Sequence, residues 1–305
     1  MDLGRVGVWW SGSWRGSDGG AGNGSDGGSD GGADVSERPP AADMEDLGYG
    51  ALWSSGGFDP GLSPRFGRLL DATERVAVAS GIVSIWHATP AQAAEGASAL
   101  EAAHPGRFLL GLGASHAPVV EPLGVDYRFP YTRMVRYLDE LDDLGPVVGP
   151  DRRVLAALGP RMLSLAAERS AGAHPYFVPA EHIERARRLM GPGPLLAPEL
   201  AVVLESDPDT ARSVARGYTA GYLRLPNYAG NLRTLGFDDN DLEGGGSDRL
   251  VDAVMAWGDV GAVADRVRSF HDAGADHVCI QVVADRATGF PLDAYRVLAA
   301  ELLRT

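Results

Sequence analysis

The stretch "PGRFLLGLGASH", from Pro105 to His116, decides how the chain is interpreted. Residues 108–112 form a continuous apolar run, which is typical of a strand buried on both faces of a sheet. The run ends in three small residues, 113–115, and a titratable His116 follows at once. Small residues at a strand end let a ligand approach the backbone closely, so this stretch predicts a core strand that ends at a binding site.

The rest of the chain repeats this pattern of short apolar runs separated by helix-like stretches. Eight strands are expected at 5–10, 50–53, 75–86, 108–113, 153–158, 173–177, 200–204 and 277–283. Helices are expected at 90–103, 130–144, 160–171, 179–190, 207–225, 260–273 and 291–303, several with Pro near the first turn. This alternation predicts an α/β fold, a single (β/α)₈ TIM barrel over residues 1–305. A doubly wound sheet is the rival, but "RVGVWWSGSW" lacks the dinucleotide fingerprint.

Two segments interrupt the alternation. Residues 16–34 are almost wholly Gly, Ser, Asp and Ala, which predicts a disordered surface insertion. A calcium-binding repeat is the alternative there, although its Asp falls two places late. Residues 226–248 are expected to form an irregular insertion before the last strand, where a barrel builds the walls of its site.

Composition excludes several classes of function. The formal charge of −14 argues against nucleic acid as a partner. All 27 basic residues are Arg, so Schiff-base chemistry and the lysine of a phosphate-binding Walker loop are excluded. The sequence has no run of 18 apolar residues and no signal peptide at its start, so a cytoplasmic protein with no membrane partner is expected. Cys279 is the single cysteine, and His182, His271 and His277 lack metal-like spacing, so no metal site is expected.

Two further predicted strands carry residues that could belong to a binding site. Ser80 and Gly81 lie inside the apolar run "VAVASGIVSIW", and a glycine there indicates a bulge, a close ligand approach or tight packing. After Leu158 and Gly159, Pro160 opens a helix whose free N–H groups could bind an anion. Arg161 in that first turn is either a second phosphate contact or a solvated side chain.

The chain resembles the luciferase-like monooxygenase superfamily, and within it the deazaflavin (coenzyme F420)-dependent oxidoreductases of actinobacterial type. The resemblance rests on "HPGRFLLGLGASH", "LAALGPRMLSLAAERSAGAHPYF", "LRLPNYAGNLRTLGF", "GSDRLVDAVMAWGD" and "DAGADHVCIQVV". It implies a barrel that binds a flavin-type ring at the carboxyl ends of its strands, a non-prolyl cis peptide at or near Ser80–Gly81, and a homodimer.

The resemblance also implies where the cofactor would be held. The corresponding positions in this sequence are Ser80, Gly81, Gly113, Ala114, Ser115, His116, Leu158, Gly159, Pro160, Arg161, His174 and Tyr176. Substrate contacts are expected from Trp10, Trp53, Asn227 and Tyr228. Relatives with an Asp-His pair after the second strand differ from this chain, which has Trp53-Ser54-Ser55 there, so sugar-phosphate dehydrogenation is not carried over.

His116 is the expected proton donor or acceptor, because its unperturbed pKa lies near working pH. The leading function is an F420-dependent oxidoreductase that acts on a small organic molecule. An FMN-dependent luciferase-like monooxygenase and a non-catalytic flavin-binding barrel are the alternatives.

Overall fold

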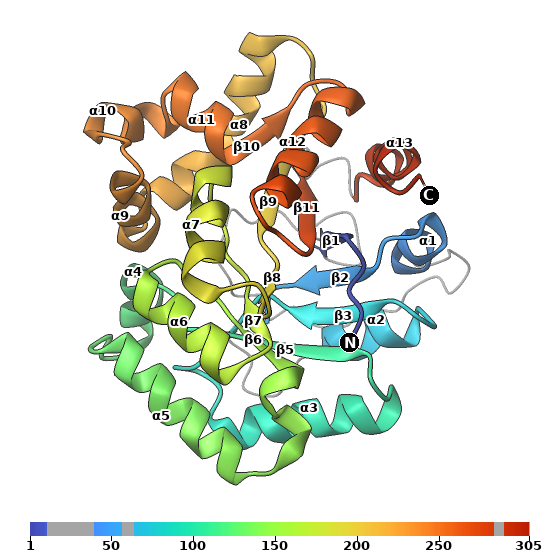
Figure 1. The fold of residues 1–305 in the computed structure, drawn as a ribbon, viewed down its shortest axis with the longest axis vertical. Helices are drawn as coiled ribbons and strands as arrows, with labels where there is room; N and C mark the ends of the chain where they lie inside the picture. Colours follow the sequence, from blue (N-terminus) through green and yellow to red (C-terminus); the bar gives the residue numbers. More distant parts are fainter. Residues whose placement is uncertain (11–39, 57–63, 284–289, 305) are drawn as a thin grey trace.

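The computed structural model describes residues 1–10, 40–56, 64–283 and 290–304. Parallel strands lie at its centre and helices surround them (Figure 1). The strands are β1 (Val6–Trp10), β2 (Ala51–Ser54), β3 (Ala77–Ser80), β4 (Val83–Ser84), β5 (Phe108–Gly113), β6 (Arg153–Leu155), β7 (Gly172–Ala173), β8 (Leu195–Leu196), β9 (Glu199–Val203), β10 (Met255–Trp257) and β11 (Val278–Val282). The expected insertion at 16–34 lies outside the described residues.

A single extended segment, 195–203, closes the ring of strands. Its first part, β8, pairs with β7, and its second part, β9, pairs with β11, which in turn pairs with β1. The Ala197 N–H donates to the Ala173 carbonyl and the Cys279 N–H donates to the Pro198 carbonyl, both at 2.9 Å. The ring thus runs β1–β2–β3–β5–β6–β7–β8/β9–β11, and the predicted (β/α)₈ barrel is confirmed. The short β10 pairs with the edge of β9 that faces away from β11.

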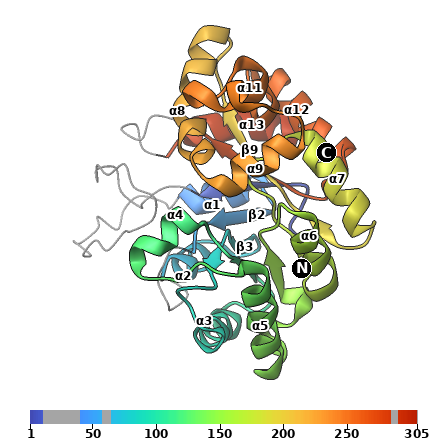
Figure 2. The same cartoon turned by 90° about the vertical axis from the view of Figure 1, so that its left-hand side faces the viewer.

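Helices cover the outside of the ring. They are α1 (Pro40–Leu47), α2 (Pro64–Asp71), α3 (Pro90–Ala103), α4 (Ala117–Val120), α5 (Pro130–Asp143), α6 (Pro160–Arg169), α7 (Ala180–Met190), α8 (Pro208–Leu223), α9 (Pro226–Thr234), α10 (Asp239–Leu242), α11 (Asp248–Val254), α12 (Val260–Asp272) and α13 (Leu292–Leu302). Figure 2 shows α3 and α5 on one side of strands β2 and β3, with α12 and α13 on the other. The C-terminal α13 packs against both α12 and α1, which completes the outer layer.

The insertion before the last strand is helical, not irregular as predicted from its sequence. Residues 226–248 contain α9, α10 and a 3₁₀ turn at Glu243–Gly245, and α11 begins at Asp248. Asp238 caps α10, since its carboxylate accepts the N–H groups of Asn240 and Asp241 at 2.9 and 3.1 Å. The run "DDND" that resembles a loop in sequence is therefore a helix cap followed by an acidic first turn.

The expected strand at 75–86 is divided in two. Between β3 and β4, the Ser80 hydroxyl bridges to the neighbouring strand, donating to the Gly111 carbonyl (3.0 Å) and accepting the Gly111 N–H (2.8 Å). The ladder with β5 then resumes with Val83 opposite Leu112. A side chain thus replaces the backbone hydrogen bonds at the point where the strand bends.

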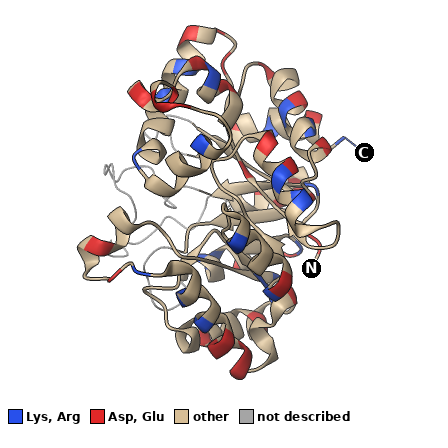
Figure 3. Cartoon of the chain, turned by 60° about the vertical axis from the view of Figure 1, so that its left-hand side comes forward, with Lys and Arg blue, Asp and Glu red and all other residues tan. Residues whose placement is uncertain are grey.

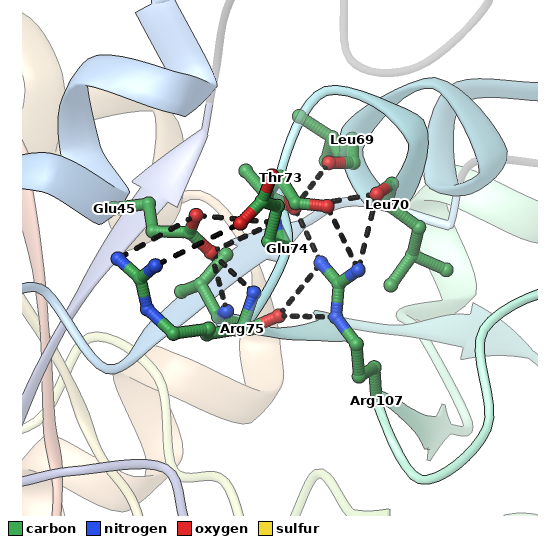
Figure 4. A network of polar contacts seen from close by, with 8 residues as sticks. Glu45, Leu69, Leu70, Thr73, Glu74, Arg75 and Arg107 are labelled. Carbon is green, nitrogen blue, oxygen red and sulfur yellow. Dashed lines mark hydrogen bonds and ion pairs between the residues drawn. The ribbon is translucent and has the colours of Figure 1, made fainter.

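The amino-terminal ends of the strands are tied together by a polar network (Figure 4). The Glu45 carboxylate of α1 accepts the N–H groups of Glu74, Arg75 and Val76 at 2.6 to 3.1 Å. Burial raises the pKa of Glu45, but these three N–H groups more than offset it and the pKa is lowered. The Arg107 guanidinium, just before β5, donates to backbone carbonyls on the other side of the same loop. This end of the barrel is closed by structural contacts.

Charged residues lie on the helices and loops, with both signs interspersed, while the strands carry few (Figure 3). Arg153, in β6, is an exception: it is fully buried, and Asp142 lies 2.7 Å from its guanidinium. None of the helices in the described ranges is long and apolar enough to cross a membrane.

Candidate active site

The carboxyl end of β5 is joined to the helical insertion. Ser115 has a left-handed backbone (φ 55°), and its carbonyl accepts hydrogen bonds from the Tyr127 hydroxyl (2.9 Å) and the Asn227 amide (3.3 Å). Asn227 lies in the first turn of α9, and Figure 1 shows α4 and α9 on the same side of the molecule. The insertion thus lies against the mouth of the barrel, as the sequence predicts for its position.

His116 directly follows Ser115 and is the N-cap residue of α4. Its ring packs on Tyr228 of α9, with ring centroids 4.7 Å apart. The His116 Nδ1 is buried and no hydrogen-bond partner reaches it within the described residues. Burial lowers the pKa of His116 to about 4, because the charged imidazolium loses its hydration. At neutral pH the ring is uncharged and can accept a proton.

The glycines of β5 make room for another part of the chain. A Cβ at Gly111 would lie 1.8 Å from the Ser80 carbonyl oxygen, and one at Gly113 would lie 2.6 Å from the Ile82 side chain. The two glycines allow the bent segment between β3 and β4 to approach β5 closely. A cofactor contact at Gly113 stays a prediction from sequence.

That bent segment carries the expected cis bond. The peptide between Gly81 and Ile82 is cis, one bond after the Ser80–Gly81 position inferred from the resemblance. Gly81 lies against the barrel interior, where an added Cβ would meet the Trp9 indole at 2.4 Å and the His174 Nε2 at 3.2 Å. The segment thus separates the inner side chains from the end of β5.

Leu158 to Arg161 form an open corner after β6. Gly159 is the N-cap residue of α6 and is exposed; apart from its chain neighbours, no atom of the described residues lies within 4 Å of the position where a Cβ would stand. Pro160 has no N–H, and no side chain caps the helix. The exposed Arg161 guanidinium lies over the Tyr131 ring, 4.0 Å from its centroid. An open helix start beside a positive charge is suited to an anionic group.

His174 lies deeper, in the barrel interior. Its ring is sandwiched between Trp53 (4.2 Å, 13°) and Trp9 (5.7 Å, 8°), and its Nδ1 lies 2.6 Å from the Ala197 carbonyl. Nδ1 therefore carries the proton, and the buried Nε2 has no partner among the described residues. Burial lowers the pKa of His174 to about 4.

The expected substrate contacts separate into two groups. Asn227 and Tyr228 lie at the mouth, as described above. Trp10 faces the outer layer and stacks on Phe290 at 4.4 Å, and Trp53 is fully buried with its indole N–H on His277 Nε2 (3.0 Å). A substrate role for Trp10 or Trp53 stays a prediction from sequence.

Tyr176 is the centre of a hydroxyl cluster that the sequence did not reveal. Its hydroxyl lies 2.8 Å from that of Tyr218 and 3.0 Å from that of Tyr222, and it donates to Gln281 Oε1 at 2.7 Å. These residues come from three separate parts of the chain, the segment after β7, α8 and β11, so only the closed barrel brings them together. Their shared signal in sequence is weak, because tyrosines at helical spacing in α8 are also typical of plain packing.

Glu199 is the second residue that the sequence reading missed. It begins β9, has 2% of its surface exposed, and contacts Tyr218 and the Phe177 N–H. Burial raises the pKa of Glu199 from 4.5 to about 8. An acid directly before the apolar run "LAVV" was the available signal, since an inward-pointing carboxyl inside a barrel is costly unless it is neutral or paired.

Comparison with known proteins finds a family model that matches part of the chain. The luciferase-like monooxygenase family model matches residues 36–145, a range that includes α1 to α5. A search of curated proteins found no match in sequence.

Solved structures share the barrel fold over most of the chain. An F420-dependent secondary alcohol dehydrogenase in complex with an F420-acetone adduct aligns with a TM-score of 0.67 and 16% identity, covering 86% of this chain and 93% of that one. The F420-dependent tetrahydromethanopterin reductase from Methanopyrus kandleri gives 0.65 and 16%, covering 87% and 93%. The FMN complex of 3,6-diketocamphane monooxygenase from Pseudomonas putida gives 0.61 and 17%, covering 86% and 90%. At these identities the likeness establishes the fold.

The residues at the mouth of this luciferase-like barrel fit a flavin-type cofactor in two respects. Open space above Gly159 and an uncapped helix start could receive a phosphate-bearing tail. The buried, unpartnered Nδ1 of His116 could bond to a polar ring. The residues that these two features point to are Ala114 to His116 and Leu158 to Arg161. Cofactor contacts from Ser80, Gly81, His174 and Tyr176 stay predictions from sequence. Within the described ranges, no group of three His, Cys, Asp or Glu side chains could hold a metal ion.

Proposed function

We propose that this protein is an oxidoreductase that transfers a hydride between the deazaflavin coenzyme F420 and a small organic substrate. The proposal is carried by two features at the ends of the neighbouring strands β5 and β6. One is the buried Nδ1 of His116, which has no partner among the described residues, and the other is the open start of α6 at Gly159. The proposal's support from relatives is the family match and the two F420-dependent enzymes that share the fold.

The chain's own residues have distinct parts in this proposal. The deazaflavin supplies or accepts the hydride when it is bound. The start of α6 and Arg161 hold its anionic tail, because no lysine exists to do so. His116, uncharged at neutral pH, accepts or returns a proton at Nδ1. Tyr228 of α9 covers the imidazole and limits its contact with water.

An FMN-dependent luciferase-like monooxygenase is the second candidate. It is favoured by the family match itself and by the shared fold of the FMN-bound diketocamphane monooxygenase. A non-catalytic flavin-binding barrel is the third. A homodimer, which the resemblance implies, stays a prediction that sedimentation velocity checks.

Cofactor titration tests the proposal. We expect oxidised F420 to bind saturably, with a change in its absorbance, and the reduced protein–F420 complex to be inert to oxygen. Mass analysis of cofactor that co-purifies with the protein provides an independent readout. Preferential binding of FMN with oxygen consumption would establish the monooxygenase instead, and binding of neither cofactor would leave the non-catalytic barrel.

The role of His116 is tested by His116→Ala. We expect turnover to fall by about 100-fold, which is typical for loss of general acid–base catalysis, with F420 affinity changed less than about threefold. In the wild type the rate should also fall as the pH drops through about 4, because a base is active only when deprotonated. His104→Ala is the control, since His104 pairs with Asp71 at the opposite end of the barrel. Equal turnover in both variants would remove His116 from the chemistry.

A further inference from the structure

Glu199 is a buried acid, and among the described residues no cationic side chain pairs with it. Its Oε1 lies 3.3 Å from the Tyr218 hydroxyl and its Oε2 lies 3.4 Å from the Phe177 N–H, both at the long end of hydrogen-bond distances. The side chain points into the barrel, and the residue is opposite Cys279 in the strand register. A carboxyl with so little solvation from its surroundings favours its neutral form.

A chain of hydroxyl groups leads from this carboxyl to the mouth of the barrel. Tyr218, which contacts Glu199, lies 2.8 Å from Tyr176, and Tyr176 lies 3.0 Å from Tyr222. Gln281 Oε1 fixes the geometry, because it accepts from Tyr176 at 2.7 Å and from Tyr218 at 3.2 Å. Glu199 is buried, whereas the three tyrosines are half-buried, so the chain runs from the core to a surface that solvent reaches.

The groups around Glu199 are all neutral at physiological pH. They come from the segment after β7, from α8, α9 and α13, and from β11. The titratable members that interact with its charge are Tyr176, Tyr218, Tyr228, Tyr295 and Cys279. The pKa of each is raised, mainly by burial, so none competes with Glu199 for loss of a proton near neutral pH.

We propose that Glu199 is a proton reservoir for the site, exchanging protons with a substrate at the barrel mouth through the hydroxyls of Tyr218 and Tyr176. The inference rests on the proposed hydride transfer and narrows its substrate class to a carbonyl compound or the corresponding alcohol. In reduction, the carbonyl carbon gains the hydride that a reduced deazaflavin supplies, and the carbonyl oxygen gains a proton from the Tyr176 hydroxyl. His116 accepts the N–H proton that the ring loses together with the hydride, so the two proton transfers use different groups. Tyr176 regains a proton along the chain from the Glu199 carboxyl, which becomes a carboxylate and is reprotonated from solvent. Alcohol oxidation runs the same transfers in reverse.

The first measurement needs no cofactor. Infrared difference spectra of the free protein, wild type minus Glu199→Gln, should show one protonated carboxyl at pH 6.5 that disappears as the pH is raised through about 8. Tyr218→Phe should move this titration to higher pH, because the Tyr218 hydrogen bond lowers the pKa of Glu199. Absence of a titrating carboxyl in the wild type would overturn the proposal.

The second measurement distinguishes a proton reservoir from a merely structural acid. Oxidation of reduced F420 is followed with a panel of small ketones and aldehydes, from pH 6 to 9. We expect the wild-type rate to fall above pH 8, and Glu199→Gln and Tyr218→Phe to lose at least about tenfold in kcat and this pH dependence. Tyr137→Phe is the matched control, because it removes a fully buried hydroxyl from α5, outside the barrel.

The outcomes separate the two proposals. Wild-type turnover that Glu199→Gln and Tyr218→Phe leave unchanged in rate and pH profile would refute the proton reservoir and leave the proposed function intact. Failure of the wild type, with F420 bound, to reduce any member of the panel would refute the substrate class and the reservoir together. Failure to bind F420 at all would refute the proposed function itself.

Discussion

At the scale of single residues, the glycines of β5 show how a local signal can have a structural cause. The absence of a Cβ at Gly111 lets the Ser80 backbone approach to a distance that no side chain would permit. The Ser80 hydroxyl then satisfies both backbone groups of Gly111. Small residues at the end of this strand indicated a close approach, but sequence alone could not tell a ligand from the protein's own chain.

Gly111→Ala is expected to destabilise the fold by about 1–3 kcal/mol or more, as is typical of overpacking against groups that cannot rotate away. The midpoint of urea unfolding measures this effect. Gly159→Ala is the control, since nothing lies within 4 Å of the added methyl group and the φ of −78° suits alanine. A Gly111→Ala protein as stable as the Gly159→Ala protein would contradict the close packing described here.

At the scale of elements, the success of sequence analysis depended on how local the determining contacts are. Residues 108–113 and 90–103 form β5 and α3 with the predicted bounds, because an apolar run and a Thr89 capping box with Gln92 are local signals. The strand at 75–86 was predicted as continuous, because its division depends on a side-chain contact with a distant strand. For the same reason, the contacts that join Glu199 to Tyr176 through Tyr218 of α8 could not be predicted from the sequence.

Helix α9 lies against the barrel mouth, and we expect its mobility to change more easily than that of the other helices. Asn227→Ala removes one of the two donors to the Ser115 carbonyl. Amide hydrogen exchange in 226–234 should then accelerate severalfold, while exchange in α3 stays unchanged, because local openings involve only the loosened element. Arg188→Ala, at an exposed position of α7, serves as the control. Equal protection of α9 in both variants would show that other contacts hold this helix.

At the scale of the whole molecule, the closed barrel depends on the pairing of β8 with β7, which is called the seam here. Gly172 has a φ of +155°, and a Cβ there would lie 1.8 Å from the Leu195 carbonyl oxygen. Gly172→Ala should therefore weaken ring closure and lower the unfolding midpoint cooperatively, in all spectroscopic probes at once. Gly193→Ala, two residues before the seam in a position with open space, should unfold like the wild type. Loss of signal from α7 and β8 alone would instead show that the seam opens without global unfolding.

The pH dependence of stability follows from the buried titratable groups taken together. The pKa values of His116, His174, His182 and His277 are lowered to about 4 by burial, below the value of 6.5 for an exposed imidazole. Between pH 4 and 6.5 the unfolded chain thus binds more protons than the folded one, so the free energy of unfolding rises with pH.

Glu199 has the opposite effect on how the free energy of unfolding changes with pH. Its pKa of about 8 in the folded protein exceeds that of an exposed carboxyl, 4.5, so the folded protein binds the additional proton between those values. At pH 6.5 the four unfolded imidazoles are still about half protonated, and together they outweigh the single proton of Glu199. The two effects balance near pH 7, and above it the free energy of unfolding should fall, by less than about 1.4 kcal/mol per pH unit, until about pH 8. Urea titrations at half-unit intervals should therefore show a maximum near pH 7 in the wild type. In Glu199→Gln the decline between pH 7 and 8 should be absent while the rise from pH 4 persists, and an unchanged decline would mean that Glu199 is ionised inside the folded barrel.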